Sequence, residues 1–281
     1  MHDRTMPTIA HISDLHFNCV ASVVAAALVA DLQENPPQVL AITGDLTQRG
    51  RRRQYAAAAA FIRQLPKPQI LTVGNHDIPL FDILRRIRRP LDRYRQYITD
   101  ELAPFYHIDS LAIAALNTAC SWTWRWNGFW RDGRISSPQL RQLEDRVRAL
   151  APATFKILVT HHPFLPPPRG HFHPVVGAEQ AVQIFEQLGI DMILSGHLHK
   201  PYSGDLRTYY PWLSRSMLCS QAGTAISTRR RRDPNAYNVI TVDSSDITIA
   251  TRCWNGSAFE QSELARYPRP ANVPPAVSYT S

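Results

Sequence analysis

The sequence predicts a single α/β domain, on two observations. Short apolar runs bounded by turn residues alternate with longer segments of helical periodicity over most of the 281 residues, a pattern typical of helices packed on a sheet. The composition, 44% hydrophobic and 19% charged, allows a sizeable core and excludes a disordered or fibrous chain. The longest apolar stretch, from Cys19 to Ala30, is too short to cross a bilayer.

Strands are predicted where apolar residues run together between turn residues. They are expected at Thr8–Asp14, Val39–Thr43, Gln69–Val73, Leu111–Leu116, Phe155–Thr160 and Asp191–Ser195. From Ser216 the pattern is typical of β-hairpins. Its strands are expected at Met217–Gln221, Ala236–Val242 and Ile247–Thr251.

Helices are predicted where apolar residues recur every three or four positions. The segments are Ser22–Glu34, Gln54–Leu65, Ser137–Leu150 and Gly177–Leu188. We expect Ser22 and Ser137 to be N-caps, because a serine hydroxyl accepts a hydrogen bond from a free N–H of the first turn. Pro138 suits that turn, since its missing N–H costs nothing there.

Two segments interrupt the alternation, and one follows it. Residues 80–106 are basic and helix-leaning, cut by Pro90. We expect one domain over 1–266, in which 80–106 and 121–134 are lid or insert segments. The proline-rich residues 267–281 show no periodicity and are predicted to be a flexible tail.

Charge and cysteine content narrow the protein class. The net charge is +8, and fourteen arginines fall into three clusters, at 49–53, 85–95 and 229–232. Such clusters attract anionic ligands or are simply solvated, and the sequence leaves both open. The four cysteines are far apart and form no CxxC, which indicates reduced thiols. The N-terminus lacks the apolar region of a signal peptide, so we expect a cytoplasmic protein.

Polar side chains that bind metals follow five of the predicted strands. They are Asp14 and His16, then Asp45, then Asn75, His76 and Asp77, then His161 and His162, and finally His197 and His199. Active sites of α/β sheets collect at the carboxyl ends of strands. Any one of these groups could be chance, but five in register predict one site.

The residue types fit two adjacent divalent metals. Two cations about 3.5–4 Å apart repel each other, so such a site needs a bridging carboxylate and several further ligands. We expect Asp14 and His16, and likewise His197 and His199, to share one side of a strand end because they are two residues apart. Glycines before Asp45, Asn75 and His197 would allow tight turns. Carboxylate, amide and imidazole ligands suit Mn, Fe, Co or Zn.

These five blocks resemble those of the calcineurin-like metallophosphoesterases: D-x-H, G-D, G-N-H-D/E, a histidine before the next loop, and G-H-x-H. All occur in order between Asp14 and His199, about two-thirds of the chain. The resemblance implies a four-layer αββα sandwich with two mixed β-sheets. It also implies a dinuclear metal site at the carboxyl ends of the strands.

Carried over to this chain, the resemblance implies a role for each residue. One metal would be held by Asp14, His16, Asp45 and His199, and the second by Asp45, Asn75, His161 and His197. His76 would contact the phosphate and Asp77 would orient His76. Of the adjacent pair, His161 is favoured over His162 as the ligand because it directly ends the strand.

The implied reaction is hydrolysis of a phosphoester by a hydroxide that bridges the two metals and attacks phosphorus in line. His76 would stabilise the developing charge or the leaving alkoxide. The chain has no P-loop and no Ser-His-Asp arrangement that would indicate an NTPase or acyl-enzyme mechanism. A non-catalytic metal-binding scaffold is the competing hypothesis, and the presence of both Asp45 and His76 argues against it.

The motif variants resemble the bacterial branch of cyclic-nucleotide and glycerophosphodiester phosphodiesterases. Protein phosphatases of the family typically have Glu after G-N-H, and a branch that cleaves the pyrophosphate of a lipid A precursor has Arg in place of His76. This chain has neither. The resemblance therefore implies a phosphodiesterase acting on a small nucleotide or glycerophosphodiester. A phosphomonoesterase, a pyrophosphate-cleaving hydrolase and a nuclease are the alternatives.

Other segments could select the substrate. Residues 82–97 are a candidate lid or homodimer surface, or a solvated amphipathic helix. The tryptophans of 122–130 could stack a nucleobase or face a lipid, or form a hydrophobic plug. The loop 223–235, with its arginines, could border the site. We expect His171 and His173 on a flexible rim rather than as ligands. No recognisable nucleic-acid-binding module is present, so nucleic acid is not the favoured partner.

Overall fold

Two six-stranded sheets form the centre of the molecule. The computed structural model describes residues 7–121, 131, 133–168, 172–230 and 233–270. The first sheet has the order β12 (Phe259–Pro268), β11 (Asp246–Trp254), β10 (Ala236–Val242), β1 (Thr8–Ile12), β2 (Val39–Ile42), β3 (Gln69–Leu71). The second has the order β4 (Phe105–Ile108), β5 (Leu111–Ala115), β6 (Phe155–Val159), β7 (Met192–Ser195), β9 (Leu218–Gln221), β8 (Tyr202–Asp205).

Both sheets are mixed, as predicted. In the first, β1, β2 and β3 are parallel, while β10, β11 and β12 continue the sheet antiparallel to their neighbours. In the second, β5, β6, β7 and β9 are parallel, and β4 and β8 close the two edges in antiparallel pairing. Because parallel neighbours end at the same edge of a sheet, the loops after β1, β2 and β3 lie together, as do those after β6 and β7.

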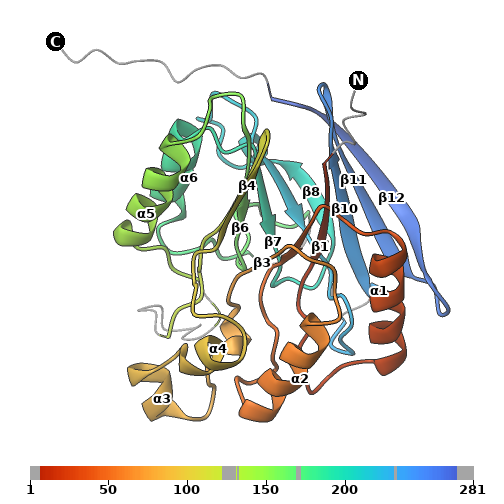
Figure 1. Cartoon of the computed structure of the whole chain (residues 1–281). Helices are drawn as coiled ribbons and strands as arrows, with labels where there is room; N and C mark the ends of the chain where they lie inside the picture. The colour runs from red at the N-terminus through yellow and green to blue at the C-terminus, as the bar shows by residue number, and fades with distance from the viewer. Residues whose placement is uncertain (1–6, 122–130, 132, 169–171, 231–232, 271–281) are drawn as a thin grey trace.

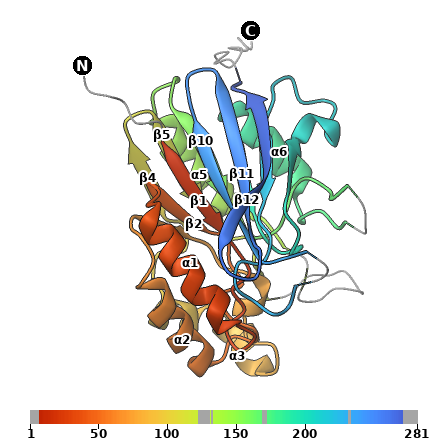
Figure 2. The same ribbon diagram turned by 90° about the vertical axis from the view of Figure 1, so that its right-hand side faces the viewer.

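Within the described residues, six α-helices accompany the sheets. They are α1 (Ser22–Glu34), α2 (Arg52–Ile62), α3 (Ile83–Arg88), α4 (Asp92–Tyr97), α5 (Ser137–Arg148) and α6 (Ala178–Gln187). Figure 1 shows α5 and α6 on the side of the second sheet and α1 on the opposite side of the molecule, with α3 and α4 near α2. Figure 2 shows β10, β11 and β12 beside β1 in the first sheet.

Three hydrophobic cores define four layers. One core joins α5 and α6 to the second sheet, another joins α1 and α2 to the first sheet, and the third lies between the sheets. Successive residues of a strand pack into different cores. In β6, Ile157 and Val159 pack between the sheets, while Leu158 packs toward the helices. This alternation follows from the two-residue period of a strand. The αββα sandwich implied by the resemblance is therefore confirmed.

The burial of both sheet faces explains why the central strands were predictable. A strand covered on both faces is a continuous apolar run, and β2, β5, β6 and β7 are buried along their whole length. β4, β8 and β12 were not predicted. They lie at sheet edges, and most residues of β12 are exposed, so their sequences lack the apolar pattern.

Three expectations need correction. Met217–Gln221 was expected in a β-hairpin with the next strand, but β9 belongs to the other sheet and runs parallel to β7. Only β10 and β11 form the predicted antiparallel pair. The N-caps are Ala21 and Ser136 rather than Ser22 and Ser137.

The structure describes only part of the segments that the sequence analysis treated as inserts or as a tail. Residues 80–106 form α3 and α4 and enter β4. β12 extends to Pro268, two residues into the predicted tail, and 271–281 lie outside the described residues. The predictions for the tryptophans of 122–130 also fall outside them. Among the described helices, none is both long and apolar enough to span a membrane.

Candidate metal centre

The loops that follow β1, β2, β3, β6 and β7 bring the predicted ligands together. Two groups of metal-binding side chains result, one from Asp14, His16, Asp45 and His199 and one around His161 and His197. The first group is drawn from three loops of two different sheets. The carboxyl ends of both sheets therefore meet at one site, as predicted.

Four side chains converge in the first half of the centre. The Nε2 atoms of His16 and His199 lie 2.9 Å apart. Asp14 Oδ1 lies 3.2 Å from His199 Nε2 and 3.6 Å from His16 Nε2. Asp45 Oδ2 lies 3.6 Å from His16 Nε2. One nitrogen from each ring and one oxygen from each carboxylate thus surround a common point.

The second half of the centre gathers around Asn75. Its Oδ1 atom lies 3.0 Å from His161 Nε2 and 3.0 Å from His197 Nδ1. Asp45 Oδ1 is 3.4 Å from His161 Nε2. The two oxygens of Asp45 therefore face different halves of the centre, which is the geometry required of a bridging carboxylate.

Backbone carbonyls set the orientation of two of the rings. His161 Nδ1 donates to Thr43 O at 2.7 Å, and His199 Nδ1 donates to Arg229 O at 2.9 Å. A carbonyl oxygen only accepts, so the hydrogen of each neutral ring sits on Nδ1 and the Nε2 lone pair points into the centre. Metal-ligating histidines are usually held in this way by a partner on the other ring nitrogen.

Buried atoms without partners show that a cation would fit here. Among the described residues, Asp14 Oδ1 and Asp45 Oδ2 are buried and make no hydrogen bond. His199 Nε2 is near Asp14 Oδ1, but the geometry does not form a bond. Buried polar atoms are normally paired, and these oxygens face imidazole lone pairs. A mixed carboxylate, amide and imidazole set without cysteine suits first-row metals such as Mn, Fe, Co or Zn.

The ionisation states favour the same interpretation. Burial opposes ionisation of Asp14 and Asp45, but nearby histidines, His199 for Asp14 and His161 for Asp45, hold the pKa of both carboxyls below the usual value. Burial and His161 lower the pKa of His197 to about 3. The carboxylates are therefore anionic and His197 is neutral near pH 7, which is the state that binds a cation. At His199, Asp14 outweighs burial and raises the pKa, so a cation bound there would displace a proton from that ring.

The backbone of the ligands is strained. Asp14, His16, Asp45, His197 and His199 all have positive φ, between 46° and 79°. Residues other than glycine rarely adopt this left-handed region, and such strain clusters at functional sites. β1 ends at Ile12 and β7 at Ser195, so the paired ligands lie beyond the strands. Their convergence comes from left-handed turns and not from strand alternation, which corrects the prediction.

Two glycines permit the close approach of the loops. A Cβ on Gly74 would lie 2.1 Å from Asp45 Oδ1, and one on Gly196 would lie 1.9 Å from Ser13 Oγ. Only a residue without a side chain fits at position 74, where the Cβ would also meet the backbone of Asp45, because real Cβ atoms essentially never come within 3.0 Å of other heavy atoms. At position 196 a Cβ would require the side chains of Ser13 and Asp14 to shift. The glycines predicted beside the ligands are needed here for space.

Comparison with known proteins agrees with this geometry. The model of the calcineurin-like phosphoesterase family matches residues 7–201, which covers the five loops of the centre. The chain belongs to the calcineurin-like phosphoesterase family. A probable cyclic nucleotide phosphodiesterase of Synechococcus sp. is 27% identical over 222 residues, which cover 71% of this chain and 76% of that protein.

Two solved structures share the fold. The purple acid phosphatase from yellow lupin seeds has a TM-score of 0.65 and 12% identity, covering 92% of this chain and 53% of that one. This phosphoesterase thus spans about half the length of the lupin enzyme. Vacuolar protein sorting 29 from Cryptosporidium parvum has a TM-score of 0.51 and 12% identity, covering 94% and 99%. At these identities the likeness concerns the fold alone.

His161 and His162 of this phosphoesterase have different surroundings. His161 faces Asn75 and Asp45, whereas His162 is engaged at both ring nitrogens, by Thr118 Oγ1 at 2.8 Å and by Arg131 O at 2.9 Å. His162 lies close enough to His161 and His197 to form a third metal-binding group. Its existing partners leave it no free lone pair for that role. The contacts therefore support the preference for His161.

His76 lies beside the first half of the centre. Its ring is 4.9 Å from that of His16, and its Nδ1 donates to Gln48 O at 2.8 Å. Arg229 donates to His76 Nε2 at 3.2 Å. Burial, together with His16 and Arg229, lowers the pKa of His76 despite Asp45, so the ring is neutral near pH 7.

Asp77 plays a different part from the one expected. Its carboxylate accepts hydrogen bonds from the backbone N–H groups of Leu46, Thr47 and Gly74 at 2.8–3.2 Å. Burial and the neighbouring Asp45 raise its pKa to about 7. Asp77 therefore ties the loop after β2 to the loop after β3. The contact that orients His76 comes from Gln48 instead.

Sequence reasoning could not have found the carbonyl partners of the rings. Thr43, Gln48 and Arg229 act through backbone oxygens, which carry no residue-type signal. The side chain of Arg229 lies in the arginine-containing loop that was expected to border the site, and its bond to His76 places it there. His173 is exposed, and His171 lies outside the described residues.

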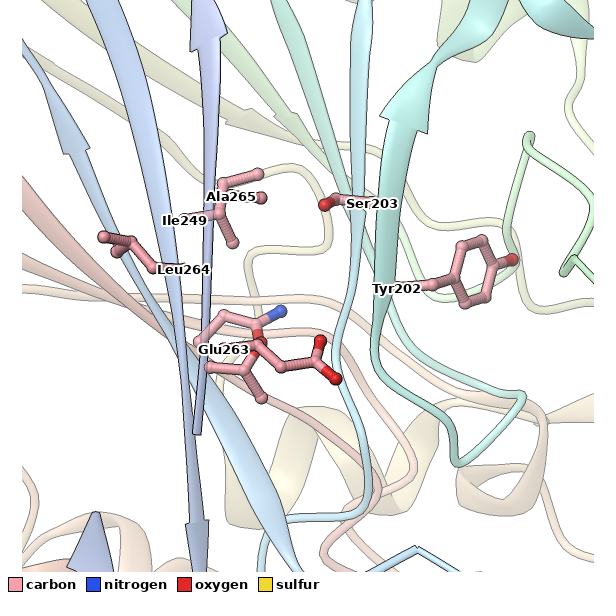
Figure 3. A pocket seen from close by; sticks show the side chains of 8 residues that line it. Tyr202, Ser203, Ile249, Glu263, Leu264 and Ala265 are labelled. Carbon is pink, nitrogen blue, oxygen red and sulfur yellow. The ribbon is translucent and has the colours of Figure 1, made fainter. Parts of the chain in front are cut away.

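A cavity of about 320 Å³ lies outside the metal centre, between β8 and strands β10–β12. Figure 3 shows Ser203 pointing from β8 toward this gap and Tyr202 pointing away from it. The hydroxyl of Tyr202 donates to Leu165 O at 2.6 Å. None of the residues lining this cavity is a predicted ligand, so it is separate from the site.

Proposed function

We propose that this chain is a phosphodiesterase that hydrolyses a small nucleotide or glycerophosphodiester with the help of two metal ions. The observation that carries the proposal is Asp45, whose two buried oxygens face separate sets of ligands. Asp14, His16 and His199 would complete one set, and Asn75, His161 and His197 the other. Two ions bound there would supply Lewis-acid activation of the phosphoryl group and of the attacking water.

The chain's own residues would handle charge and proton transfer around the phosphoryl group. The guanidinium of Arg229 sits beside His76 and can donate to a phosphoryl oxygen. His76 Nε2 is the atom that could accept a proton and deliver it to the leaving oxygen. A bound phosphodiester anion would raise the pKa of His76 from its lowered value. Gln48 O keeps the ring turned so that Nε2, and not Nδ1, faces the site.

Preference for a diester is supported by the relative from Synechococcus, which is named a probable cyclic nucleotide phosphodiesterase. The presence of histidine at 76 and aspartate at 77 agrees with it. Phosphomonoester or pyrophosphate hydrolysis at the same centre is the second candidate, because Arg229 adds a cation that suits a more highly charged phosphate.

The test compares two chromogenic esters on metal-free protein reloaded with Mn²⁺. Bis(p-nitrophenyl) phosphate should turn over faster than p-nitrophenyl phosphate. Asp45→Asn should lower turnover at least about 100-fold, since even an indirect partner of a metal ligand is worth about 10–100-fold. Asp109→Asn is the matched control, because this exposed residue has a φ of 49° that asparagine also adopts. Faster turnover of the monoester would overturn the diesterase proposal.

A further inference from the structure

A second cavity, of about 500 Å³, lies between the start of α2 and α4. We call it the arginine pocket, and its lining residues are Asn18, Arg51, Arg52, Arg53, Gln54 and Arg93. Three of the arginines belong to the start of α2 and one to α4. Two helices distant in sequence therefore direct positive charge into one space.

The loops of the metal centre continue directly into this pocket. Asn18 follows the predicted ligand His16 by two residues, so their Cα atoms are at most about 7 Å apart. Gln48, whose carbonyl holds His76, precedes Arg51 by three residues. Arg93 Nη1 donates to Gly50 O at 2.7 Å, which fixes α4 against the same loop. A ligand of modest length could reach from the centre into the pocket.

The positive charge of the pocket is not neutralised within the described part of the chain. There, no carboxylate lies within 4.0 Å of the guanidinium nitrogens of Arg51, Arg52 or Arg53. Arg93 is 3.6 Å from Asp82, but Asp82 also binds Arg85 more closely at 3.1 Å. Three arginines at the start of α2 also oppose the helix dipole, which favours anions there. An anion in the pocket would offset both effects.

Gln54 supplies an uncharged donor to the same space. The residue is only 6% exposed, and its Oε1 accepts the N–H groups of Arg49 and Arg51 at 2.9 and 3.3 Å. Its Nε2 amide has no hydrogen-bond partner among the described residues. Gln54 Nε2 is not among the buried atoms that lack a partner, so it reaches the open space of the cavity, where its hydrogens can be donated to an acceptor.

We propose that the arginine pocket binds a second phosphate of the substrate, separate from the phosphodiester that is cleaved. This inference rests on the proposed function and narrows it to small phosphodiesters that carry an additional terminal phosphate. Arginine forks bind phosphate oxygens in pairs, and Gln54 adds a neutral donor. The second phosphate would lower KM by anchoring the substrate on the side of His16.

Anion binding to metal-free protein tests the pocket without requiring activity. Pyrophosphate is titrated calorimetrically at 150 mM salt, where weak surface charge effects are largely screened. Arg52→Gln with Arg53→Gln should weaken binding about tenfold or more. Arg63→Gln, the same change at the opposite end of α2, is the control and should leave affinity unchanged.

Two esters with the same leaving group test whether the pocket serves the substrate. Thymidine 5′-(p-nitrophenyl phosphate) is compared with its 3′-phosphorylated form on the Mn²⁺-loaded enzyme. The extra phosphate should lower KM about tenfold, and the double variant should bring the ratio of the two KM values close to one. If neither ester is hydrolysed, the proposed function fails while the calorimetry still decides the anion site.

Three results would overturn the inference. The first is absence of pyrophosphate binding, and the second is an equal loss of affinity in Arg63→Gln. The third is a KM that does not respond to the added phosphate. A single-stranded decanucleotide that binds more tightly than pyrophosphate, with a steep salt dependence removed by the double variant, would assign the pocket to a nucleic-acid backbone instead.

Discussion

Gly74→Ala should disrupt the metal centre without replacing any ligand. A Cβ at this position would lie 2.1 Å from Asp45 Oδ1 and 2.2 Å from Asp45 N. The Asp45 backbone cannot turn away as a flexible side chain would, because the residue is held in a left-handed turn with φ 52°. To reach even a tight contact the loops must separate by about 1 Å. Metal–ligand distances tolerate only about 0.2 Å.

A separation of this size should weaken metal binding about 10–100-fold and lower turnover by about 100-fold. Strain of this kind in a packed site should also destabilise the fold by about 1–3 kcal/mol. Bound Mn²⁺ is counted by mass spectrometry after gel filtration, and stability is followed by denaturant unfolding. Gly223→Ala is the control, because its Cβ would meet nothing closer than 3.3 Å. Two tightly bound metals in Gly74→Ala would refute the reasoning.

The other predictions concern Arg229 beside the metal centre, the hydrophobic core and the pH dependence of stability. Burial, His16 and Arg229 lower the pKa of His76, so Arg229→Gln should raise that pKa. The acidic limb of the kcat/KM profile should then move to higher pH. An unchanged acidic limb would show that the titration of His76 does not produce it. Phe185→Ala should lower the free energy of unfolding by about 3–5 kcal/mol, because the ring is fully buried and packs 5.5 Å from Phe164; a melting temperature equal to that of the parent chain would contradict this packing. Burial lowers the pKa of His11 to about 3, whereas its pKa in the unfolded chain is about 6.5. Between these two pH values the unfolded state binds one more proton than the folded state. The free energy of unfolding therefore falls as pH drops from about 6.5 toward 3. His11→Gln should reduce that slope by about 1.4 kcal/mol per pH unit near pH 5, measured by urea unfolding of the metal-free protein, and an unaltered slope would show that His11 does not contribute.

The central strands and the edge strand β3 were predictable, whereas the edge strands β4, β8 and β12 were not. β5 and β6 are covered on both faces, so their positions demand apolar residues throughout. β12 is mostly exposed on the outer edge of the first sheet and is held by its backbone ladder to β11. Backbone hydrogen bonds place few demands on residue type, so Glu260 and Gln261 serve there as well as apolar residues.

Sheet membership was also beyond the sequence. β9 and β10 are neighbours along the chain and both are apolar, which made a hairpin the simplest prediction. In the structure, β9 pairs with β7 and β10 pairs with β1, so the chain crosses from one sheet to the other between them. A local apolar pattern indicates that a strand is buried, but it does not indicate which sheet the strand joins.

The residue types of the centre were evident from their spacing, whereas its finer organisation was not. Asp14, Asp45 and His199 could be named from strand-end motifs alone, because metal chemistry restricts the residues that can stand there. The left-handed turns that orient them and the role of Asp77 in joining two loops became evident only in the tertiary structure. So did the arginine pocket, whose Arg93 comes from a helix more than thirty residues beyond Gln54.

By itself, the sequence determined the α/β class, the central strands and the ligand types, because burial and metal coordination each act on residue identity at a given position. The tertiary structure alone decided which sheet each strand joins, which ring nitrogen faces the centre, and that arginines of α2 and α4 line one cavity. These depend on backbone carbonyls such as Thr43 O and on distances between segments far apart in the chain. Backbone carbonyls are common to all residues, and distances between segments depend on the whole fold, so neither can be inferred from the order of side chains.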